Sequence, residues 1–294
     1  MKLESIEELY SIYSRYPSVV TDTRKLNQGD LYFALKGPNF NGNLFAIAAL
    51  EAGASYAIVD ELIANSDSYQ DRIILVQDVL TTLQQLAKYH RQQFDIPFIA
   101  ITGSNGKTTT KELVYSVLAS HFKTYTTQGN LNNHIGVPLT LLSIPKNAAM
   151  AVIEMGANHQ KEIESYCAYT LPTFGMITNC GKAHLEGFGG VEGVKKGKGE
   201  LYDYLRNNNR ITEKVNFIDS TFLTSSPSAL HKEIKNSYLM PNPSDVSFEI
   251  LKNYENKCKN DVFFAMSHGV HRGELKKGKF DNRELFINKL KKLN

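Results

Sequence analysis

Apolar and polar positions in residues 1 to about 90 alternate in a way that predicts short strands around a helix. Three runs rich in β-branched and aromatic residues, "DLYFALKG", "SYAIVD" and "RIILVQD", are typical of strands. Between the first two, "NLFAIAALEAGA" is typical of a helix. This order indicates a small α/β unit. From Val79 the apolar positions repeat about every 3.6 residues, so we expect a helix to about Gln93, where "FDIP" ends it.

The segment from residue 93 onward predicts a parallel sheet. "PFIAIT" is wholly apolar, which is typical of a strand buried on both faces. It is followed by a glycine-containing loop and by a helix with Leu113, Val114, Val117 and Leu118 on one face. Two more apolar strands are expected in "AAMAVIEMG" and "TFGMITNCG", each followed by polar and glycine residues. Because ligands of open α/β sheets bind at the carboxyl ends of the strands, the three polar tips are expected to form one site.

The character of the sequence changes after about residue 210, where Asn, Ser and Pro become frequent and no long buried-strand run follows. We therefore predict a small α/β domain at 1–92, a parallel-sheet domain at 93–210 and an unassigned tail at 211–294. In the tail, His268 and His271 have no third ligand nearby and are interpreted as part of a polar turn rather than a metal site.

Composition narrows the classes of protein that fit. The chain has 294 residues, 42% of them hydrophobic, and no apolar run of about 18 residues that could span a bilayer. Its net charge of +3 is too small to indicate nucleic-acid binding. The amino terminus lacks the apolar core of a secretory signal, and the spacing of Cys167, Cys180 and Cys258 fits neither a metal clip nor a disulfide framework. We expect a cytoplasmic protein with reduced thiols, without membrane insertion and without a nucleic-acid partner.

The stretch "ITGSNGKTTTKE" at 101–112 carries the strongest candidate chemistry. It departs from the general phosphate-loop pattern, G-x-x-x-x-G-K-S/T, because Ile101 stands where the first glycine belongs. Backbone N–H groups would face phosphate oxygens, the Lys107 amine would meet the terminal phosphates and the Thr108 hydroxyl would ligate Mg²⁺. The alternative is a plain strand-to-helix turn. The predicted nucleotide-binding residues are Gly103, Ser104, Asn105, Gly106, Lys107, Thr108 and Thr109.

Three polar residues near the other strand ends are candidates that no pattern assigns alone. Glu154 closes the second strand, where a carboxylate suits a Mg²⁺ ligand but could also cap a helix. His184 follows the third strand, and a lone histidine is more often structural than a ligand. Lys198, in "VKKGKGELYDYL", would by itself be interpreted as a solvated surface lysine.

Taken together, the shortened glycine loop, "IEMGANHQ" and "ITNCGKAHLEGFGGVEGVKKGKGELYDYL" resemble the ATP domain of the Mur ligases, which are ATP-dependent amide-bond-forming enzymes of peptidoglycan synthesis. "TQGNLNNHIGVPLTLL" and "TDTRKLNQGDLYFALKGPNFNGNLF" resemble one branch of that family, whose members join D-alanyl-D-alanine to UDP-N-acetylmuramoyl-tripeptide. The resemblance covers residues 1 to about 210. It implies a UDP-substrate-binding amino-terminal domain and a P-loop-type ATP domain.

The resemblance also implies ATP and two Mg²⁺ ions as cofactors. Thr108 and Glu154 would hold the first ion with the ATP phosphates, and His184 would be a ligand of the second. Lys198 corresponds to the family's carbamylated lysine, and a carbamate would turn this ammonium into an anion able to hold Mg²⁺. Lys107, His184 and Lys198 are therefore the expected catalytic residues.

Two sets of residues are implied for the UDP-linked substrate. In the amino-terminal domain, Thr23, Arg24 and Lys36 are the candidates for the UDP end. A second set falls where the family's central domain faces the substrate, although by itself it would be interpreted as a polar turn. Its members are Asn130, Asn132, Asn133 and His134.

The implied reaction transfers the γ-phosphoryl group of ATP to the carboxylate of the UDP-linked peptide, and the amine of D-alanyl-D-alanine then attacks the acyl phosphate. Family members continue into the rest of the ATP domain and a carboxyl-terminal domain, neither of which is recognisable in 211–294, so we expect an incomplete ATP domain. We also expect a monomer. Two alternatives stay open. One is an inactive remnant that only binds nucleotide or UDP-sugar, and the other is a different Mur ligase or a folylpolyglutamate synthase.

Overall fold

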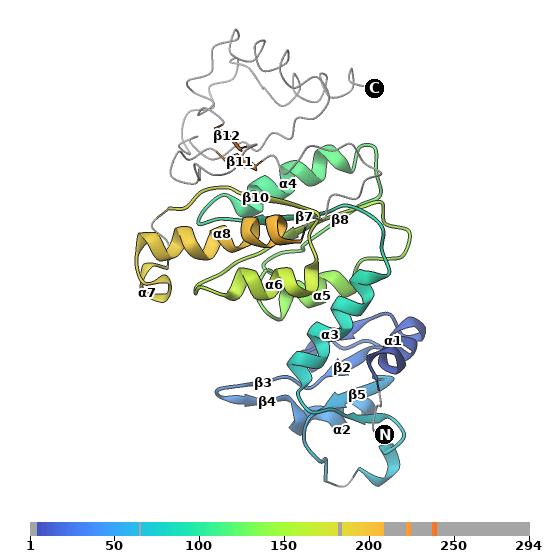
Figure 1. Cartoon of the computed structure of the whole chain (residues 1–294). Coiled ribbons are helices and arrows are strands. Elements are labelled where there is room, and N and C mark those ends of the chain that lie inside the picture. Colours follow the sequence, from blue (N-terminus) through green and yellow to red (C-terminus); the bar gives the residue numbers. More distant parts are fainter. Residues whose placement is uncertain (1–4, 65, 182–183, 209–221, 225–236, 240–294) are drawn as a thin grey trace, which may run out of the picture.

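The computed structural model describes residues 5–64, 66–181, 184–208, 222–224 and 237–239. They contain two four-stranded parallel sheets joined by a long helix (Figure 1). The predicted α/β class with parallel sheets is confirmed.

The amino-terminal sheet has the strand order β1-β2-β5-β6. Its three longer strands and the helix α2 are those expected from the apolar pattern. Three further strands of two residues each, β1, β3 and β4, were not expected as separate strands because so short a run has no periodicity. The elements of this unit are α1 (Ile6–Arg15), β1 (Val19–Val20), η1 (Thr23–Lys25), β2 (Leu31–Phe33), β3 (Lys36–Gly37), β4 (Phe40–Asn41), η2 (Gly42–Phe45), α2 (Ala46–Glu51), β5 (Tyr56–Val59), η3 (Asp67–Tyr69) and β6 (Ile73–Leu75).

The connecting helix α3 (Val79–Gln92) begins where the apolar period predicts and ends one residue before Gln93. It packs against α1 in the first unit and against α5 (Gly136–Leu142) and α6 (Glu162–Thr170) in the second. The Arg91 guanidinium donates hydrogen bonds of 2.9 and 3.0 Å to the carbonyls of Thr170 and Leu171. One continuous apolar core therefore runs through both units.

The second sheet has the order β10-β7-β9-β8 and is covered on both faces, with α4 on one face and α5 and α6 on the other (Figure 1). Along β7, Ile99 and Ile101 pack with Val114 of α4, whereas Phe98 and Ala100 belong to the core on the opposite face. The predicted burial on both faces is thus confirmed. The remaining elements are β7 (Phe98–Thr102), α4 (Lys107–Leu118), β8 (Thr124–Thr126), β9 (Met150–Glu154), β10 (Phe174–Ile177), α7 (Leu185–Phe188) and α8 (Val191–Asn207).

The order of the strands decides where a ligand can bind. β9 lies on one side of β7 and β10 on the other, so the path of the chain across the second sheet reverses at β7. Such a reversal leaves a crevice at the carboxyl ends of the strands. The strands of the first sheet follow one another in sequence order, without a reversal.

Beyond α8 the structure describes two short strands, β11 (Phe222–Thr224) and β12 (Ser237–Leu239), which pair in parallel. Cys258, His268 and His271 lie outside the described residues. In the described part of the chain, none of the helices has both the length and the apolar character needed to cross a membrane.

Candidate functional site

The glycine loop follows β7 and opens α4, as predicted. Gly106 has a φ of 77° at the residue before the helix, a conformation that favours glycine. Gly103 has a φ of 145°, and a Cβ there would overlap the Thr178 hydroxyl at the end of β10. The Thr178 hydroxyl also donates to the carbonyl of Asn105 over 2.6 Å. The loop therefore packs against the residue that follows β10, at the crevice that the strand order creates.

Lys107 is the first residue of α4, and its amine turns back over the loop. The Nζ atom donates to the carbonyls of Gly103, at 2.8 Å, and Ser104, at 3.2 Å. Burial lowers the pKa of Lys107, while the charge of Glu154 acts in the opposite direction. A cation beside the N–H groups of a helix amino terminus is suited to anionic oxygens.

Glu154 ends β9 with only 1% of its surface exposed. Its Oε1 atom accepts hydrogen bonds from the Thr108 hydroxyl, at 3.2 Å, and from the Asn132 amide, at 2.7 Å. Its Oε2 atom is buried without a partner, and the other three such atoms among the described residues belong to hydroxyl groups. A buried carboxylate oxygen without a partner carries a large desolvation cost. The helix-cap interpretation is wrong, because the residue that precedes α6 is Lys161.

Two further residues, which are not among the predicted site residues, hold the backbone of Glu154: Thr127 directly and Lys111 through Thr127. The Thr127 hydroxyl accepts the backbone N–H of Glu154 over 2.9 Å, and Lys111 donates to the Thr127 carbonyl over 2.6 Å. Lys111 is 1% exposed, although a lysine in "TTTKE" has no sequence signal for burial. The buried face of α4 is the signal that could have found it, because Lys111 falls between Thr110 and Val114 on that face.

Lys198 in α8 is 2% exposed, so its interpretation as a solvated surface lysine is wrong. Its amine donates to the Ala157 carbonyl over 3.1 Å and lies 5.0 Å from the centre of the Phe188 ring. Burial, followed by the nearby charge of Lys107, lowers the pKa of Lys198 to about 8. Two residues further along α8, Glu200 accepts the N–H groups of Lys161 and Glu164 at the start of α6, which fixes α8 against that helix.

His184 lies apart from these contacts. Its side chain is exposed, its φ of 52° is left-handed, and it immediately precedes α7. Within the described ranges it forms no hydrogen bond or ion pair with Glu154 or Lys198, and no three His, Cys, Asp or Glu side chains gather into a metal site. The role of His184 at a second metal site stays a prediction.

The candidates for the UDP end lie together at the carboxyl edge of the first sheet. Thr23 and Arg24 are in η1, after β1, and Lys36 follows β2. Arg24 is ion-paired with Asp22 at 2.8 Å, and Lys36 with Asp60 at 3.0 Å. The hydrogen bond to Asp60 raises the pKa of Lys36.

The four polar residues before α5 separate into different roles. Asn132 contacts Glu154, as described above. The Asn133 side-chain oxygen accepts the N–H groups of Ile135 and Gly136 at the start of α5, and the His134 carbonyl accepts a hydrogen bond from Gln84 of α3. Asn130 is exposed. The polar-turn interpretation thus fits Asn133, whereas Asn132 joins the glycine-loop site.

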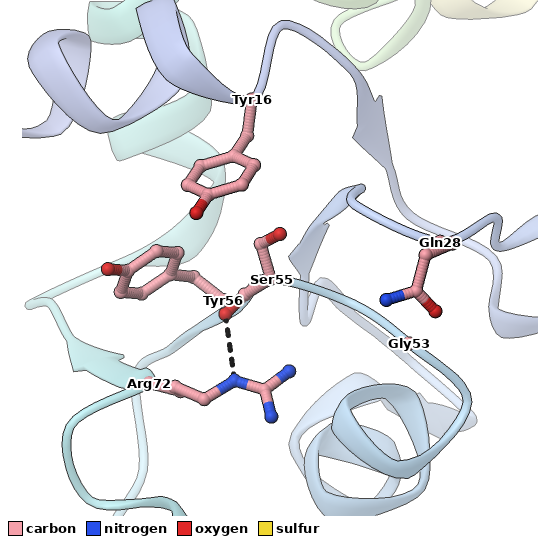
Figure 2. A pocket seen from close by; sticks show the side chains of 6 residues that line it. All are labelled: Tyr16, Gln28, Gly53, Ser55, Tyr56 and Arg72. Carbon is pink, nitrogen blue, oxygen red and sulfur yellow. Dashed lines mark hydrogen bonds between the residues drawn. The ribbon is translucent and has the colours of Figure 1, made fainter.

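A separate hollow of about 340 Å³ lies at the amino ends of β5 and β6, at the edge of the first sheet opposite Lys36. Figure 2 shows the hydrogen bond of 3.1 Å from Arg72 to the Ser55 carbonyl within it. None of the predicted site residues lines this hollow. Its lining residues are Tyr16, Gln28, Gly53, Ser55, Tyr56 and Arg72.

Comparison with known proteins assigns the fold and the loop to a family. The sequence profile of the Mur ligase middle domain matches residues 101–269, more than half of the chain. The chain belongs to the Mur ligase family. The match begins inside β7 and continues past residue 210, into the segment that the sequence analysis left unassigned.

Several members of the Mur ligase family are similar to the chain. The UDP-N-acetylmuramoyl-tripeptide–D-alanyl-D-alanine ligases of Bacillus subtilis and Escherichia coli are each 43% identical to it, over 64% and 65% of its length and 41% of theirs. Crystal structures of MurF from Acinetobacter baumannii and of MurF from Thermotoga maritima in complex with ADP match it at 36% and 31% identity, with TM-scores of 0.62 and 0.64. They cover 70% and 76% of this chain and 43% and 49% of their own. The predicted resemblance is confirmed, and the chain spans less than half the length of these relatives.

Proposed function

We propose that the chain acts in an ATP-dependent ligase of peptidoglycan precursor synthesis, which joins D-alanyl-D-alanine to UDP-N-acetylmuramoyl-tripeptide through an acyl phosphate. The observation that carries this proposal is the buried, unpartnered Oε2 atom of Glu154, adjacent to the Thr108 hydroxyl at the start of the glycine-loop helix. The names of the relatives support the choice of substrates, and one of them was solved with ADP.

The residues present fit a magnesium ion at the end of β9. Mg²⁺ takes oxygen ligands and commonly uses one or two protein groups together with nucleotide phosphates. Glu154 offers a carboxylate oxygen without a competing partner, and Thr108 offers a hydroxyl 3.2 Å from the other carboxylate oxygen. When bound, the ion would neutralise charge on the transferred phosphoryl group.

In the proposed reaction the protein supplies positive charge and alignment. Phosphoryl transfer to a carboxylate brings two anions together, so catalysis depends on electrostatic stabilisation and positioning. Lys107, whose amine lies over the loop carbonyls, would turn toward the terminal phosphates when nucleotide fills the loop. The N–H groups of Ser104 and Asn105 donate to Asn179, so the N–H groups from Gly106 to Thr109, at the start of the helix, would hold the remaining phosphate oxygens.

Lys198 is proposed to carry a carbamate. Carbamylation needs a neutral amine, whose nitrogen forms a bond to the carbon of CO₂ while a proton leaves to solvent. A pKa of about 8 for Lys198 raises the neutral fraction near pH 7 far above that of an ordinary lysine, which supports this role. The nearby charge of Lys107 would favour the resulting anion. His184 is proposed as a ligand of a second Mg²⁺ on the family resemblance.

The amino-terminal unit is proposed to bind the UDP end of the substrate through Thr23, Arg24 and Lys36. Their shared position at the carboxyl edge of the first sheet supports this, since that is the edge at which α/β sheets bind ligands. Asn132 would contribute to the metal site through Glu154.

A second candidate is a chain that binds nucleotide and UDP-sugar without ligation. The observation that favours it is that the described residues hold a candidate binding edge on each of the two sheets. Both candidates require the glycine loop and the first sheet.

Phosphate release from ATP separates the two candidates. The ligase predicts Mg²⁺-dependent release that requires both UDP-N-acetylmuramoyl-tripeptide and D-alanyl-D-alanine, measured against a Lys107→Ala control. Phosphate release no higher than in this control would rule out the ligase function for this chain. Binding of UDP-sugar peptide, measured by calorimetry, would then support the second candidate, and no binding would remove that one too.

A further inference from the structure

We propose that Lys111 is a positioning residue for the metal site, acting through Thr127 to fix the carboxylate of Glu154 relative to Thr108. This inference rests on the proposed function, because it assigns a purpose to contacts behind the proposed Mg²⁺ ligand. Lys111 would not touch the metal or the nucleotide.

The contacts form an unbroken path. The Lys111 amine donates to the Thr127 carbonyl over 2.6 Å, and the Thr127 hydroxyl accepts the N–H of Glu154 over 2.9 Å. Lys111 is 1% exposed and Thr127 is fully buried. The Lys111 amine also lies 2.9 Å from a carboxylate oxygen of Glu112, whose side chain is 56% exposed.

The geometry of α4 explains why one helix can hold Glu154 twice. Residues three apart in an α-helix lie on neighbouring positions of one face. Thr108 reaches the Glu154 side chain directly, and Lys111, three residues later, reaches its backbone through Thr127. The helix that carries the glycine-loop threonine is therefore tied to both ends of the same glutamate.

Thr127 has a particular place in the sheet. β8 ends at Thr126, so β8 has no backbone carbonyl to accept the N–H group of Glu154 in the neighbouring strand β9. The side-chain hydroxyl of Thr127 accepts that N–H group instead. This bond depends on where Thr127 lies, and two contacts hold that residue: its N–H donates to the Val152 carbonyl over 3.1 Å, and its carbonyl accepts the Lys111 amine. A buried lysine amine is costly to desolvate, and an apolar side chain would fill the same space at lower cost. Its contact with Thr127 gives a reason for an amine at this position.

The test compares ADP binding with and without Mg²⁺, by calorimetry on the full chain. Lys111→Met keeps the length of the side chain and removes the amine. We expect the Mg²⁺ concentration for half-maximal enhancement of ADP binding to rise about tenfold, as for other residues that orient metal ligands. ADP binding without metal should change less than about twofold, because the glycine loop is untouched.

Three further variants keep the test informative if Lys111→Met folds poorly. Thr127→Val removes the hydroxyl and should raise the Mg²⁺ requirement, as Lys111→Met does. Thr127→Ser keeps the hydroxyl and should show the Mg²⁺ requirement of the unchanged chain. The matched control is Thr126→Val. Thr126 is a buried neighbour whose hydroxyl donates to the Val152 carbonyl over 3.0 Å and does not contact Glu154, so its loss should leave the Mg²⁺ requirement unchanged.

The outcomes separate this inference from the proposed function. If the unchanged chain shows no metal-dependent ADP binding, the proposed function is overturned and the role of Lys111 with it. If the unchanged chain shows it but Lys111→Met and Thr127→Val match Thr126→Val, the positioning role alone is overturned. Equal weakening of ADP binding with and without metal would indicate a purely structural lysine and would also overturn it.

Discussion

The two parallel sheets present polar groups at their carboxyl ends in different ways. At the first sheet, Lys36 pairs with Asp60 and Glu61, and its side chain is 43% exposed. At the second, Glu154 and Lys198 are 1% and 2% exposed, and one oxygen of Glu154 has no partner. At the first edge the partly exposed Lys36 neutralises its carboxylate partners, of which Asp60 is buried, whereas at the second edge a buried carboxylate oxygen is left without a partner.

This difference follows from the order of the strands. Only the second sheet has a central strand at which the chain path reverses, so the loops after β7 and β10 converge, with α8 packed beside them. Glu154 and Lys198 are shielded from water there, although Thr108 at the start of α4 is exposed, and electrostatic interactions between buried groups are stronger than between solvated ones. Similar sheets can therefore support a recognition surface in one unit and a reactive site in the other.

The largest expected change in stability comes from removing the buried charge of Lys198 at the second edge. Replacing Lys198 with Met removes an ammonium that the fold desolvates, and a pKa of about 8 against the ordinary 10.5 corresponds to a cost of up to about 3 kcal/mol. Below pH 8 both the folded and unfolded states are protonated, so this cost is present in full. Between pH 8 and 10.5 the folded state loses its proton first, and stability recovers as pH rises.

Lys198→Met should thus be more stable than the unchanged chain at pH 7, with a gap that shrinks by pH 10. Urea denaturation in CO₂-free buffer measures it, because dissolved CO₂ could modify the amine. A gap that stays constant with pH would contradict this assignment of the buried charge.

A smaller effect is expected from neutralising the carboxylate at the end of β9. Glu154→Gln keeps an oxygen for Thr108 and Asn132 and replaces the unpartnered oxygen with an amide. We expect ADP affinity in the presence of Mg²⁺ to fall about 30-fold, on the order of 2 kcal/mol. Glu61→Gln, at the edge of the first sheet, is the matched control and should leave ADP binding unchanged in calorimetry. Equal losses of ADP affinity for the two substitutions would contradict the assignment of nucleotide binding to the second edge.

The smallest effect on stability is expected at the first edge. The ion pair of Lys36 with the exposed Glu61 contributes little to stability. The Asp60 carboxylate is buried, with its side chain 4% exposed, but it also accepts hydrogen bonds from Asn43 and Val79, so Lys36→Met should lower the urea midpoint only slightly. Under the proposed function it should weaken UDP binding about tenfold, the size of effect of a lost charge-assisted contact. A marked loss of stability with unchanged UDP binding would assign Lys36 a structural role instead.

The sequence predicts three of the four strands of the second sheet, because β7, β9 and β10 are apolar runs followed by glycine or polar residues. The strand before the glycine loop, the loop and α4 lie where "PFIAITGSNGKTTT" indicates. Glu154 could be nominated because an acidic residue directly after an apolar run is visible locally. Each of these inferences uses only neighbours along the chain.

Contacts between distant segments could not be predicted in the same way. The burial of Lys198 depends on Phe188 and on the loop at Ala157, and neither is implied by a lysine-rich helix. Lys111 is buried because β8 lies beside α4, and the polar strand "TYT" has no apolar run to reveal it. Asn132 reaches Glu154 across 22 positions of sequence.

The helix between the two sheets has a consequence for how two bound molecules would meet. Because α3 is packed into one core with both units and is fastened by Arg91 to the end of α6, it acts as a spacer of fixed length. Two molecules held at the carboxyl edges of the two sheets would therefore stay at a separation that this helix sets. An encounter of two solutes would then become an intramolecular event with a high effective concentration, set by a single helix.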